Sequence, residues 1–248
     1  MHAVARLREA RLARSRKPFL ARGSNAPRCP QCRVPLSHCL CAFRPEVPTR
    51  AGMCLIMCDI EPLKPSNTGW LVADVVQDSF AFGWARTEVD PALLALLADP
   101  QWEPYLVFPG EFAEPQRVVH AVHPARDKRP LFVLLDATWP EACKMFRKSP
   151  YLNHLPVLSL QSERLSRYQL RRSRRDEHFC TSEVAALCLE LAHEPQAAEV
   201  LDAYLDVFTH HYLQAKRCKA ADLHSPAHQR LQGLVQAGGA REVPASGA

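Results

Sequence analysis

Four cysteines fall within thirteen residues near the N-terminus, and their spacing suits a metal ion. Cys29 and Cys32 form a C-x2-C pair, and Cys39 and Cys41 follow as C-x-C after a gap of six residues. Thiolates grouped in this way hold zinc tetrahedrally, and four sulfur ligands leave no open position for a catalytic water. We therefore expect one structural zinc ion. The alternatives are that His38 replaces one sulfur or that the thiols bind no metal.

A second group of reactive side chains follows an apolar run at residues 131–135. The run is typical of a strand buried on both faces, and it leads into Asp136, Thr138 and Trp139. Pro140 then opens a stretch of good helix formers. Ligands of α/β proteins bind at the carboxyl ends of such strands, so these side chains could form a binding site. The alternative is that Thr138 only caps the helix and Trp139 only fills the core.

Other apolar runs end in polar loops in the same way. Residues 53–58 lead into the loop 59–69, residues 105–108 lead into Pro109, and Thr181 or Ser182 can cap a helix over residues 184–192. These hydroxyl, amide and glycine residues favour a pocket for a polar ligand, or they simply form turns and caps.

The predicted elements alternate along the chain. Strands are expected at residues 53–58, 80–84, 105–108, 131–135 and 157–160, with helices at 91–97, after Pro140, and at 184–192 and 204–212. Residues 71–76 could form either a helix or a strand. Strands that alternate with helices predict an α/β fold with a mostly parallel sheet.

Composition narrows the class of protein. The chain has 248 residues, of which 47% are hydrophobic and 23% charged, which is enough for a sizeable core. No apolar run approaches the ~20 residues that a membrane helix needs, and the N-terminus lacks the apolar core of a signal peptide. With ten cysteines, the chain is expected to be cytoplasmic with reduced thiols and no membrane contact. Nothing indicates an obligatory protein partner.

The net charge of +5 is unevenly distributed. Residues 1–28 contain seven Arg and one Lys against Glu9 alone, which predicts a basic disordered arm that contacts nucleic acid; a plain leader or a transit peptide is the alternative. A second basic cluster contains no acid within twelve residues and predicts a phosphate-binding surface for RNA. This cluster consists of Arg164, Arg167, Arg171, Arg172, Arg174 and Arg175.

Taken together, these motifs resemble the DTW-domain family, and in particular its bacterial tRNA-uridine aminocarboxypropyltransferases. The resemblance covers about residues 29–215 and keeps the order of the family's motifs. One departure is Ala137, where the family usually has glycine. The matching stretches are the four cysteines and residues 59–69, 107–109, 136–142, 144–152 and 180–183.

The resemblance implies a SPOUT-like α/β fold, with a mostly parallel sheet and a trefoil knot, preceded by a zinc knuckle. We therefore divide the chain into a basic disordered arm (1–28), a cysteine zinc knuckle (29–44), a DTW catalytic domain (45–218) and a disordered tail (219–248). A knot breaks the general rule against threaded connections, so only the resemblance predicts it.

The resemblance also implies a reaction. The 3-amino-3-carboxypropyl group of S-adenosylmethionine would move to N3 of a uridine in tRNA, giving acp3U and methylthioadenosine. Asp136 is the predicted catalytic residue, because a carboxylate could take the N3 proton. A SPOUT-like RNA methyltransferase and a non-catalytic zinc-containing RNA-binding module are the alternatives. The residues expected to bind S-adenosylmethionine are Glu61, Ser66, Asn67, Thr68, Gly69, Pro109, Thr138, Trp139, Thr181 and Glu183.

Overall fold

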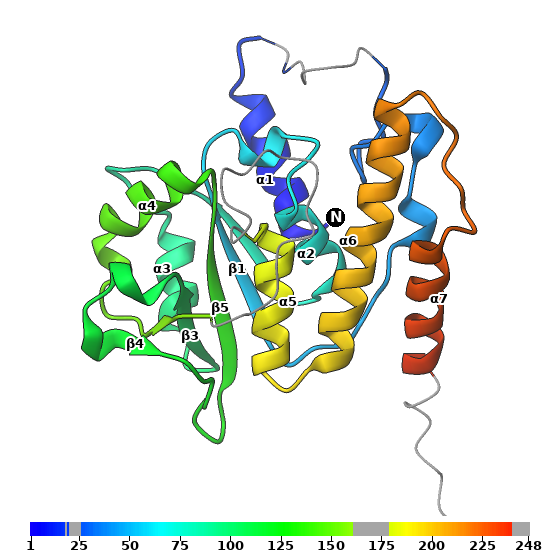
Figure 1. Cartoon of the computed structure of the whole chain (residues 1–248). Helices are drawn as coiled ribbons and strands as arrows, with labels where there is room; N and C mark the ends of the chain where they lie inside the picture. The colour runs from blue at the N-terminus through cyan, green and yellow to red at the C-terminus, as the bar shows by residue number, and fades with distance from the viewer. Residues whose placement is uncertain (18, 20–25, 161–178, 240–248) are drawn as a thin grey trace, which may run out of the picture.

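One parallel β-sheet forms the centre of the structure, a computed structural model that describes residues 1–17, 19, 26–160 and 179–239 (Figure 1). The six strands of this sheet lie in the order β2-β1-β5-β3-β6-β4, and every neighbouring pair is parallel. All the strands therefore end at the same side, which we call the carboxyl edge. The strands are β1 (Gly52–Met57), β2 (Ser79–Gly83), β3 (Trp102–Val107), β4 (Val118–Val119), β5 (Arg129–Asp136) and β6 (Val157–Leu158).

Strands β1 and β5 lie side by side within the sheet, paired from Gly52 and Leu131 to Met57 and Asp136. Successive side chains of a strand point to opposite faces, so Leu55 joins the core on one side of the sheet and Ile56 joins the core on the other. All six residues of β1 are buried. This burial on both faces accounts for the continuous apolar runs in the sequence.

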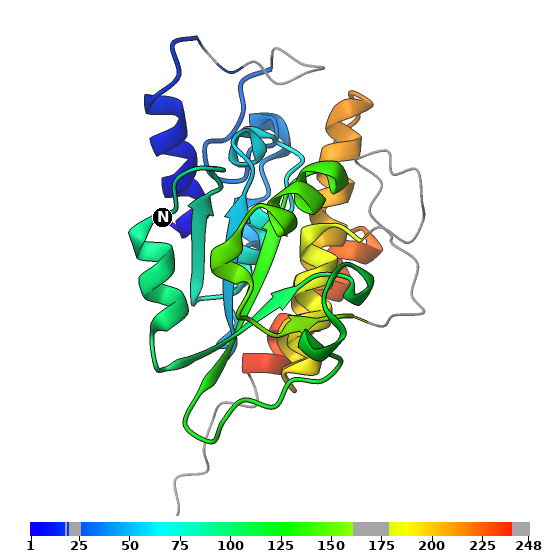
Figure 2. The same cartoon turned by 90° about the vertical axis from the view of Figure 1, so that its left-hand side faces the viewer.

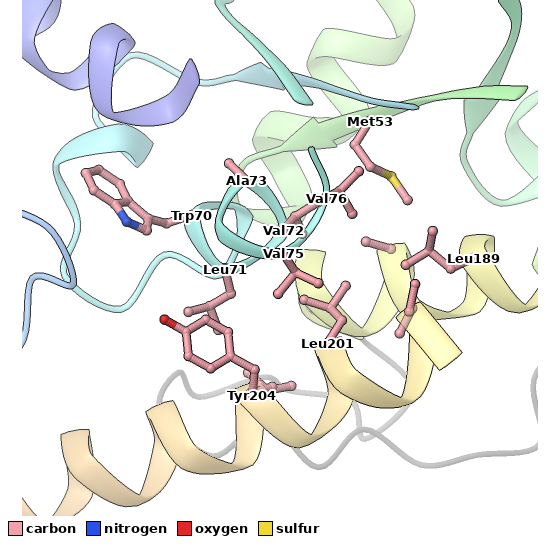
Figure 3. Packing of buried hydrophobic residues seen from close by; sticks show 14 of the residues in the cluster. Met53, Trp70, Leu71, Val72, Ala73, Val75, Val76, Leu189, Leu201 and Tyr204 are labelled. Atoms are coloured by element: carbon pink, nitrogen blue, oxygen red, sulfur yellow. The ribbon is translucent and has the colours of Figure 1, made fainter. Parts of the chain in front are cut away.

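Helices cover both faces of the sheet (Figures 1 and 2). Helices α2 (Gly69–Val75), α5 (Thr181–Leu191) and α6 (Pro195–Lys216) pack on one face, and α3 (Pro91–Ala98) and α4 (Trp139–Arg147) pack on the other. Helix α2 is buried along its whole length, with Leu71 and Val75 facing Leu201 and Tyr204 of α6 (Figure 3). No helix in the described ranges is long and apolar enough to cross a membrane.

The predicted α/β class with a parallel sheet is confirmed, and residues 71–75 of the ambiguous segment belong to helix α2, with Val76 as its extended C-cap. A small difference lies at the start of α5. Its N-cap is Cys180, one residue before Thr181, and the Glu183 side chain accepts the Cys180 amide at 2.8 Å. The trefoil knot stays a prediction.

The N-terminus differs from the expected disordered arm, because residues Ala3–Ala13 form helix α1. Val4 is fully buried, and Leu7 packs against the same core. His2 caps the helix by accepting a hydrogen bond from the Ala5 amide at 3.3 Å. Its ring packs against Trp70 in a T-shaped arrangement, with the ring centroids 4.6 Å apart. Two apolar side chains and one cap are too weak a pattern to predict a helix from the sequence. In the folded protein they hold the helix in place, because Val4 and Leu7 pack against the core.

The expected disordered tail also contains a helix, α7 (Pro226–Gly239), which packs against α6. His228 of α7 is fully buried and meets His211 of α6, with 2.9 Å between their Nε2 atoms. Ser225 lies 2.8 Å from the other ring nitrogen of His228, and the Phe43 ring packs on both histidines. Arg230 adds ion pairs to two aspartates of α6, namely Asp202 and Asp206.

The histidine contact predicts a pH-dependent stability. Burial lowers the pKa of His211 to about 4 and also lowers the pKa of His228. An unfolded histidine takes up a proton near pH 6.5, so these two groups lose their stabilising contribution as the pH falls from about 6.5 towards 4. We expect this effect to remove about 1–2 kcal/mol of the unfolding free energy between pH 7 and pH 5.

Asp74 acts in the opposite direction, because burial raises its pKa to about 6. The informative measurement is therefore the difference between the wild type and His211→Asn in chemical denaturation at pH 7 and pH 5. The variant should be less stable at pH 7 and should lose less on acidification. Equal losses in the two proteins would contradict the assignment to His211.

Candidate functional site

The carboxyl edge collects side chains from segments that are far apart in the sequence. The loop of residues 58–68 follows β1, Asp136 ends β5, Pro109 follows β3, and α5 begins at Thr181. The backbone already joins two of these segments, since the Cys58 amide donates to the Asp136 carbonyl at 3.0 Å. The parallel strands therefore bring the ends of these four segments to one edge of the sheet.

Asp136 lies at the centre of this edge, and only 1% of its surface is exposed. The Asn67 amide nitrogen donates to Asp136 Oδ2 at 2.8 Å, and the Thr181 hydroxyl donates to Oδ1 at 2.9 Å. Asn67 also donates to Glu61 at 3.2 Å, and Glu61 forms a 2.5 Å ion pair with Lys64. The carboxylate that the sequence predicts to be catalytic is thus buried in a polar network, which hereafter is called the Asp136 network.

The first turn of α5 closes the network from the other side. Ser182 donates its backbone amide to the Thr68 hydroxyl at 3.3 Å, which ties α5 to the loop after β1. Glu183 is buried and forms a capping box with Cys180. Such a box satisfies backbone groups at a helix start and fixes the direction of the chain. The Thr181 hydroxyl is therefore held towards Asp136.

Gly69 is required by close packing against the same carboxylate. A Cβ atom built on Gly69 would lie 2.3 Å from Asp136 Oδ2, which is closer than any real contact of this kind. The backbone of α2 can approach the end of β5 only because this residue has no side chain. The glycine of the polar loop thus has a steric role at the site.

Thr138 and Trp139 occupy the exposed side of the edge, on the α4 side of the sheet. Thr138 caps α4 through a reciprocal contact with Glu141. The Trp139 indole stacks on Phe108 with ring centroids 5.5 Å apart and is 37% exposed, so it does not simply fill the core. Ala137 has no positive φ, so its backbone is one that alanine readily adopts in place of the usual glycine.

The arginine cluster at 164–175 lies outside the described residues. The structure separates the other predicted residues into two groups. Pro109, Thr138 and Trp139 lie on adjacent loops of the exposed side, and Ser66 is half-buried in the loop after β1. The residues that form the Asp136 network or directly adjoin it are Glu61, Asn67, Thr68, Gly69, Asp136, Thr181 and Glu183.

The four cysteines near the N-terminus form one cluster, as predicted. Their sulfur atoms all lie within 4.8 Å of one another. The distances are 3.6 Å between Cys29 and Cys41 and 3.8 Å between Cys32 and Cys39. Four sulfurs bound tetrahedrally at ~2.3 Å from zinc would stand about 3.8 Å apart. The geometry fits a metal such as zinc, which would be held by Cys29, Cys32, Cys39 and Cys41 without His38.

Arg33 connects this cluster to the Asp136 network, a role that the sequence did not predict. It directly follows Cys32, has a φ of 64°, and is only 3% exposed. One guanidinium nitrogen donates to the backbone carbonyls of Lys64 and Asn67, both at 3.1 Å, and the group stacks 4.1 Å above the Trp70 ring. The only signal in the sequence is a charged residue immediately after the C-x2-C pair.

Comparison with known proteins agrees with this arrangement. A family model described as DTW domain matches residues 26–213, a range that contains both the cysteine cluster and the Asp136 network. The tRNA-uridine aminocarboxypropyltransferase 2 of Drosophila melanogaster is a distant homologue, 26% identical over 185 residues, which cover 70% of this chain and 70% of the relative. No solved structure matches the chain.

The cysteine cluster generates a prediction about metal and loop order. Protein purified without added zinc should contain about one equivalent of the metal. The double variant Cys39→Ser/Cys41→Ser should lose the metal. The turn that carries Arg33 would then no longer be held in place, so the backbone amides of residues 59–69 should exchange hydrogen faster. Metal analysis and hydrogen exchange provide the two readouts.

Cys218→Ser is the matched control, since Cys218 is exposed and lies outside the cluster. It should retain the metal and the protection of residues 59–69. Metal-free wild-type protein in which all four thiols titrate freely would refute the metal site. Metal loss without faster exchange at residues 59–69 would refute the coupling through Arg33.

Gly69 generates a second prediction. Gly69→Ala should lower the unfolding free energy by about 1–3 kcal/mol, because the added methyl group forces Asp136 or α2 to move. Gly233→Ala in α7 is the matched control, since a Cβ atom there would meet nothing within 4 Å. That substitution should be neutral or stabilise by up to about 1 kcal/mol. Similar denaturation midpoints for the two variants would contradict the steric role of Gly69.

Proposed function

The chain belongs to the DTW domain family, and on this premise we propose that it transfers the 3-amino-3-carboxypropyl group of S-adenosylmethionine to N3 of a uridine in tRNA. The products would be acp3U in tRNA and methylthioadenosine. The observation that carries the proposal is the family match together with a homologue named for this activity. The convergence of polar side chains at the carboxyl edge supports it, because substrates of open α/β sheets bind there.

The residues at the edge suit the two ends of S-adenosylmethionine. Its sulfonium activates several carbons, and the reaction that follows depends on which carbon lies in line with the nucleophile. Attack by N3 on the terminal carbon of the carboxypropyl chain breaks the bond to sulfur, which keeps the electron pair and leaves as methylthioadenosine. The chain's task is therefore to hold the methionine moiety extended towards the uridine.

The proposed binding residues fall on two sides of the carboxyl edge, the buried side with the Asp136 network and the exposed side with Trp139. The buried side offers Glu61 and Glu183 for the substrate's ammonium group and hydroxyl donors at Ser66 and Thr68 for its carboxylate, while the Thr181 hydroxyl donates to Asp136. The exposed side offers Trp139, whose indole is already stacked on Phe108 and could pack against adenine or uracil. Thr138, Gly69 and Pro109 shape the loops around these groups.

Asp136 has two candidate roles, as a base for N3–H or as the group that positions its neighbours. Its burial and its hydrogen bonds from Asn67 and Thr181 support the positioning role. In that role the carboxylate acts through Asn67 and Thr181, and the N3 proton leaves to another acceptor. The two roles give different results in the variant described below.

The remaining parts of the chain complete the proposal. The cysteine cluster would hold a structural zinc ion, which fits the sulfur distances given above. The arginines between Arg164 and Arg175 would hold the tRNA backbone, since twelve residues without an acid suit a polyanion. The domain division into residues 29–44 and 45–218 is kept as part of this proposal.

The activity is tested by incubating purified protein with S-adenosylmethionine and tRNA. We expect methylthioadenosine in solution and an acp-modified uridine in the digested tRNA, both measured by mass spectrometry. S-adenosylhomocysteine with a methylated nucleoside would instead indicate a methyltransferase. Binding of tRNA with no product from either substrate would indicate a non-catalytic module.

Asp136→Asn separates the two roles of the aspartate in the same assay. A positioning role predicts weaker S-adenosylmethionine binding and a lower Tm, because Asn67 and Thr181 donate to different oxygens of Asp136 and the NH2 group that replaces one of these oxygens cannot accept a hydrogen bond. A base role predicts that turnover falls by ~10²-fold or more while cofactor affinity and Tm stay near the wild type. Wild-type behaviour in all three measurements would contradict both roles.

A further inference from the structure

We propose that helix α1 and the residues that follow it form a fixed basic rim beside the active-site edge, and that this rim binds the phosphate backbone of the tRNA. The proposal rests on the function proposed above, and it assigns a partner surface to a segment that composition alone presents as a loose arm. The basic rim is defined here as Arg14, Arg16 and Lys17.

The helix is anchored to the body of the protein at its N-terminal half. Val4 is fully buried, and the side chain of Leu7 reaches the end of β2, where it would lie 3.8 Å from a Cβ atom on Gly83. His2 adds a polar anchor, with its Nε2 atom 3.5 Å from the buried carboxylate of Asp74. Residues 1–7 therefore fix the position of the helix against the edge of the sheet.

The C-terminal half of α1 extends beyond the sheet on the side of the candidate site. Leu7 stands level with the end of β2, and at 1.5 Å per residue Arg14 lies roughly 10 Å further along the helix axis. Figures 1 and 2 both show α1 rising past the carboxyl edge. A substrate that places one nucleotide at this edge would have its neighbouring phosphates within reach of the rim.

A bidentate ion pair fixes this half of the helix to the site loop. Arg11 donates to both carboxylate oxygens of Asp59, at 2.7 and 2.8 Å. Asp59 opens the loop that carries Glu61 and Asn67 of the Asp136 network. Paired guanidinium and carboxylate groups of this kind give a defined orientation as well as attraction. The basic rim therefore has a set position relative to the site.

The charge of the rim is available to a partner. Arg14, Arg16 and Lys17 are exposed, and within the described part of the chain none of them forms an ion pair. Residues 1–17 contain five arginines and one lysine against Glu9 alone, and Arg11 is the member already neutralised by Asp59. A cationic surface of this density beside the site of an RNA-modifying reaction is complementary to a phosphate backbone.

The test measures equilibrium binding of total tRNA to the full chain across a range of salt concentrations, without S-adenosylmethionine. The triple variant Arg14→Gln/Arg16→Gln/Lys17→Gln should bind at least ~10-fold more weakly at low salt. Its log–log salt slope should be lower by about one for each tRNA phosphate that the variant no longer neutralises. Its affinity for S-adenosylmethionine and its circular dichroism spectrum should match the wild type.

The matched control is Arg50→Gln/Arg126→Gln/Lys128→Gln. It also removes three positive charges, but just before β1 and β5, at the amino ends of the strands and away from the carboxyl edge. It should retain the wild-type slope. An unchanged slope in the rim variant, or equal losses in both triple variants, would overturn the proposal. Wild-type protein that binds no tRNA would also overturn it.

The binding experiment and the activity assay can fail separately, although the rim proposal rests on the proposed function. Wild-type protein that forms methylthioadenosine while the rim variant keeps its salt slope would refute the rim and leave the function standing. If the rim variant has a lower salt slope but the wild-type protein forms no product, the rim proposal stands and the proposed function is refuted.

Discussion

A carboxylate buried at the end of the central strand is the constraint on which the carboxyl edge depends. Burying Asp136 without partners would cost several kcal/mol, so the fold must supply hydrogen-bond donors to it. It supplies Asn67 from the loop after β1 and Thr181 from the start of α5, two residues separated by more than a hundred positions. Gly69 lets α2 approach the same oxygen. The polar loops that look like separate motifs in the sequence therefore have one common partner.

Arg33 extends the same constraint to the cysteine cluster. Its guanidinium holds the carbonyls of Lys64 and Asn67, so the backbone of the site loop is fixed from one side by Arg33 and from the other by Asp136. The charge of Arg33 is stabilised by these carbonyls and by the face of Trp70. A metal in the cluster would fix the turn that presents Arg33, which gives a structural metal a direct effect on the order of the site although it lies outside the site.

The sequence predicted those parts of the fold that depend on local patterns. Apolar runs identified the buried strands, and the position of Asp136 at the end of one of them was correct because the run stops there. The neighbours of each strand were beyond prediction, since β1 pairs with β5 across a long stretch of chain. Helix α1, the contact of His211 with His228 and the position of Arg33 depend on surfaces that exist only in the folded protein.

The burial of Asp136 also bears on where substrates can act. The polar network lies on the inner side of the edge, where its side chains are already paired, whereas Thr138 and Trp139 lie on the outer side and are exposed. Under the proposed function, a uridine in a large RNA would approach from the exposed outer side, and the smaller methionine moiety of S-adenosylmethionine would lie nearer the Asp136 network. In the proposed reaction this edge would divide the two substrates by size, with the Asp136 network shaping the loops around the smaller substrate and Trp139 facing the RNA. A carboxylate that accepts hydrogen bonds from both Asn67 and Thr181 joins two segments of this edge, and this contact is the basis of the positioning role proposed for Asp136.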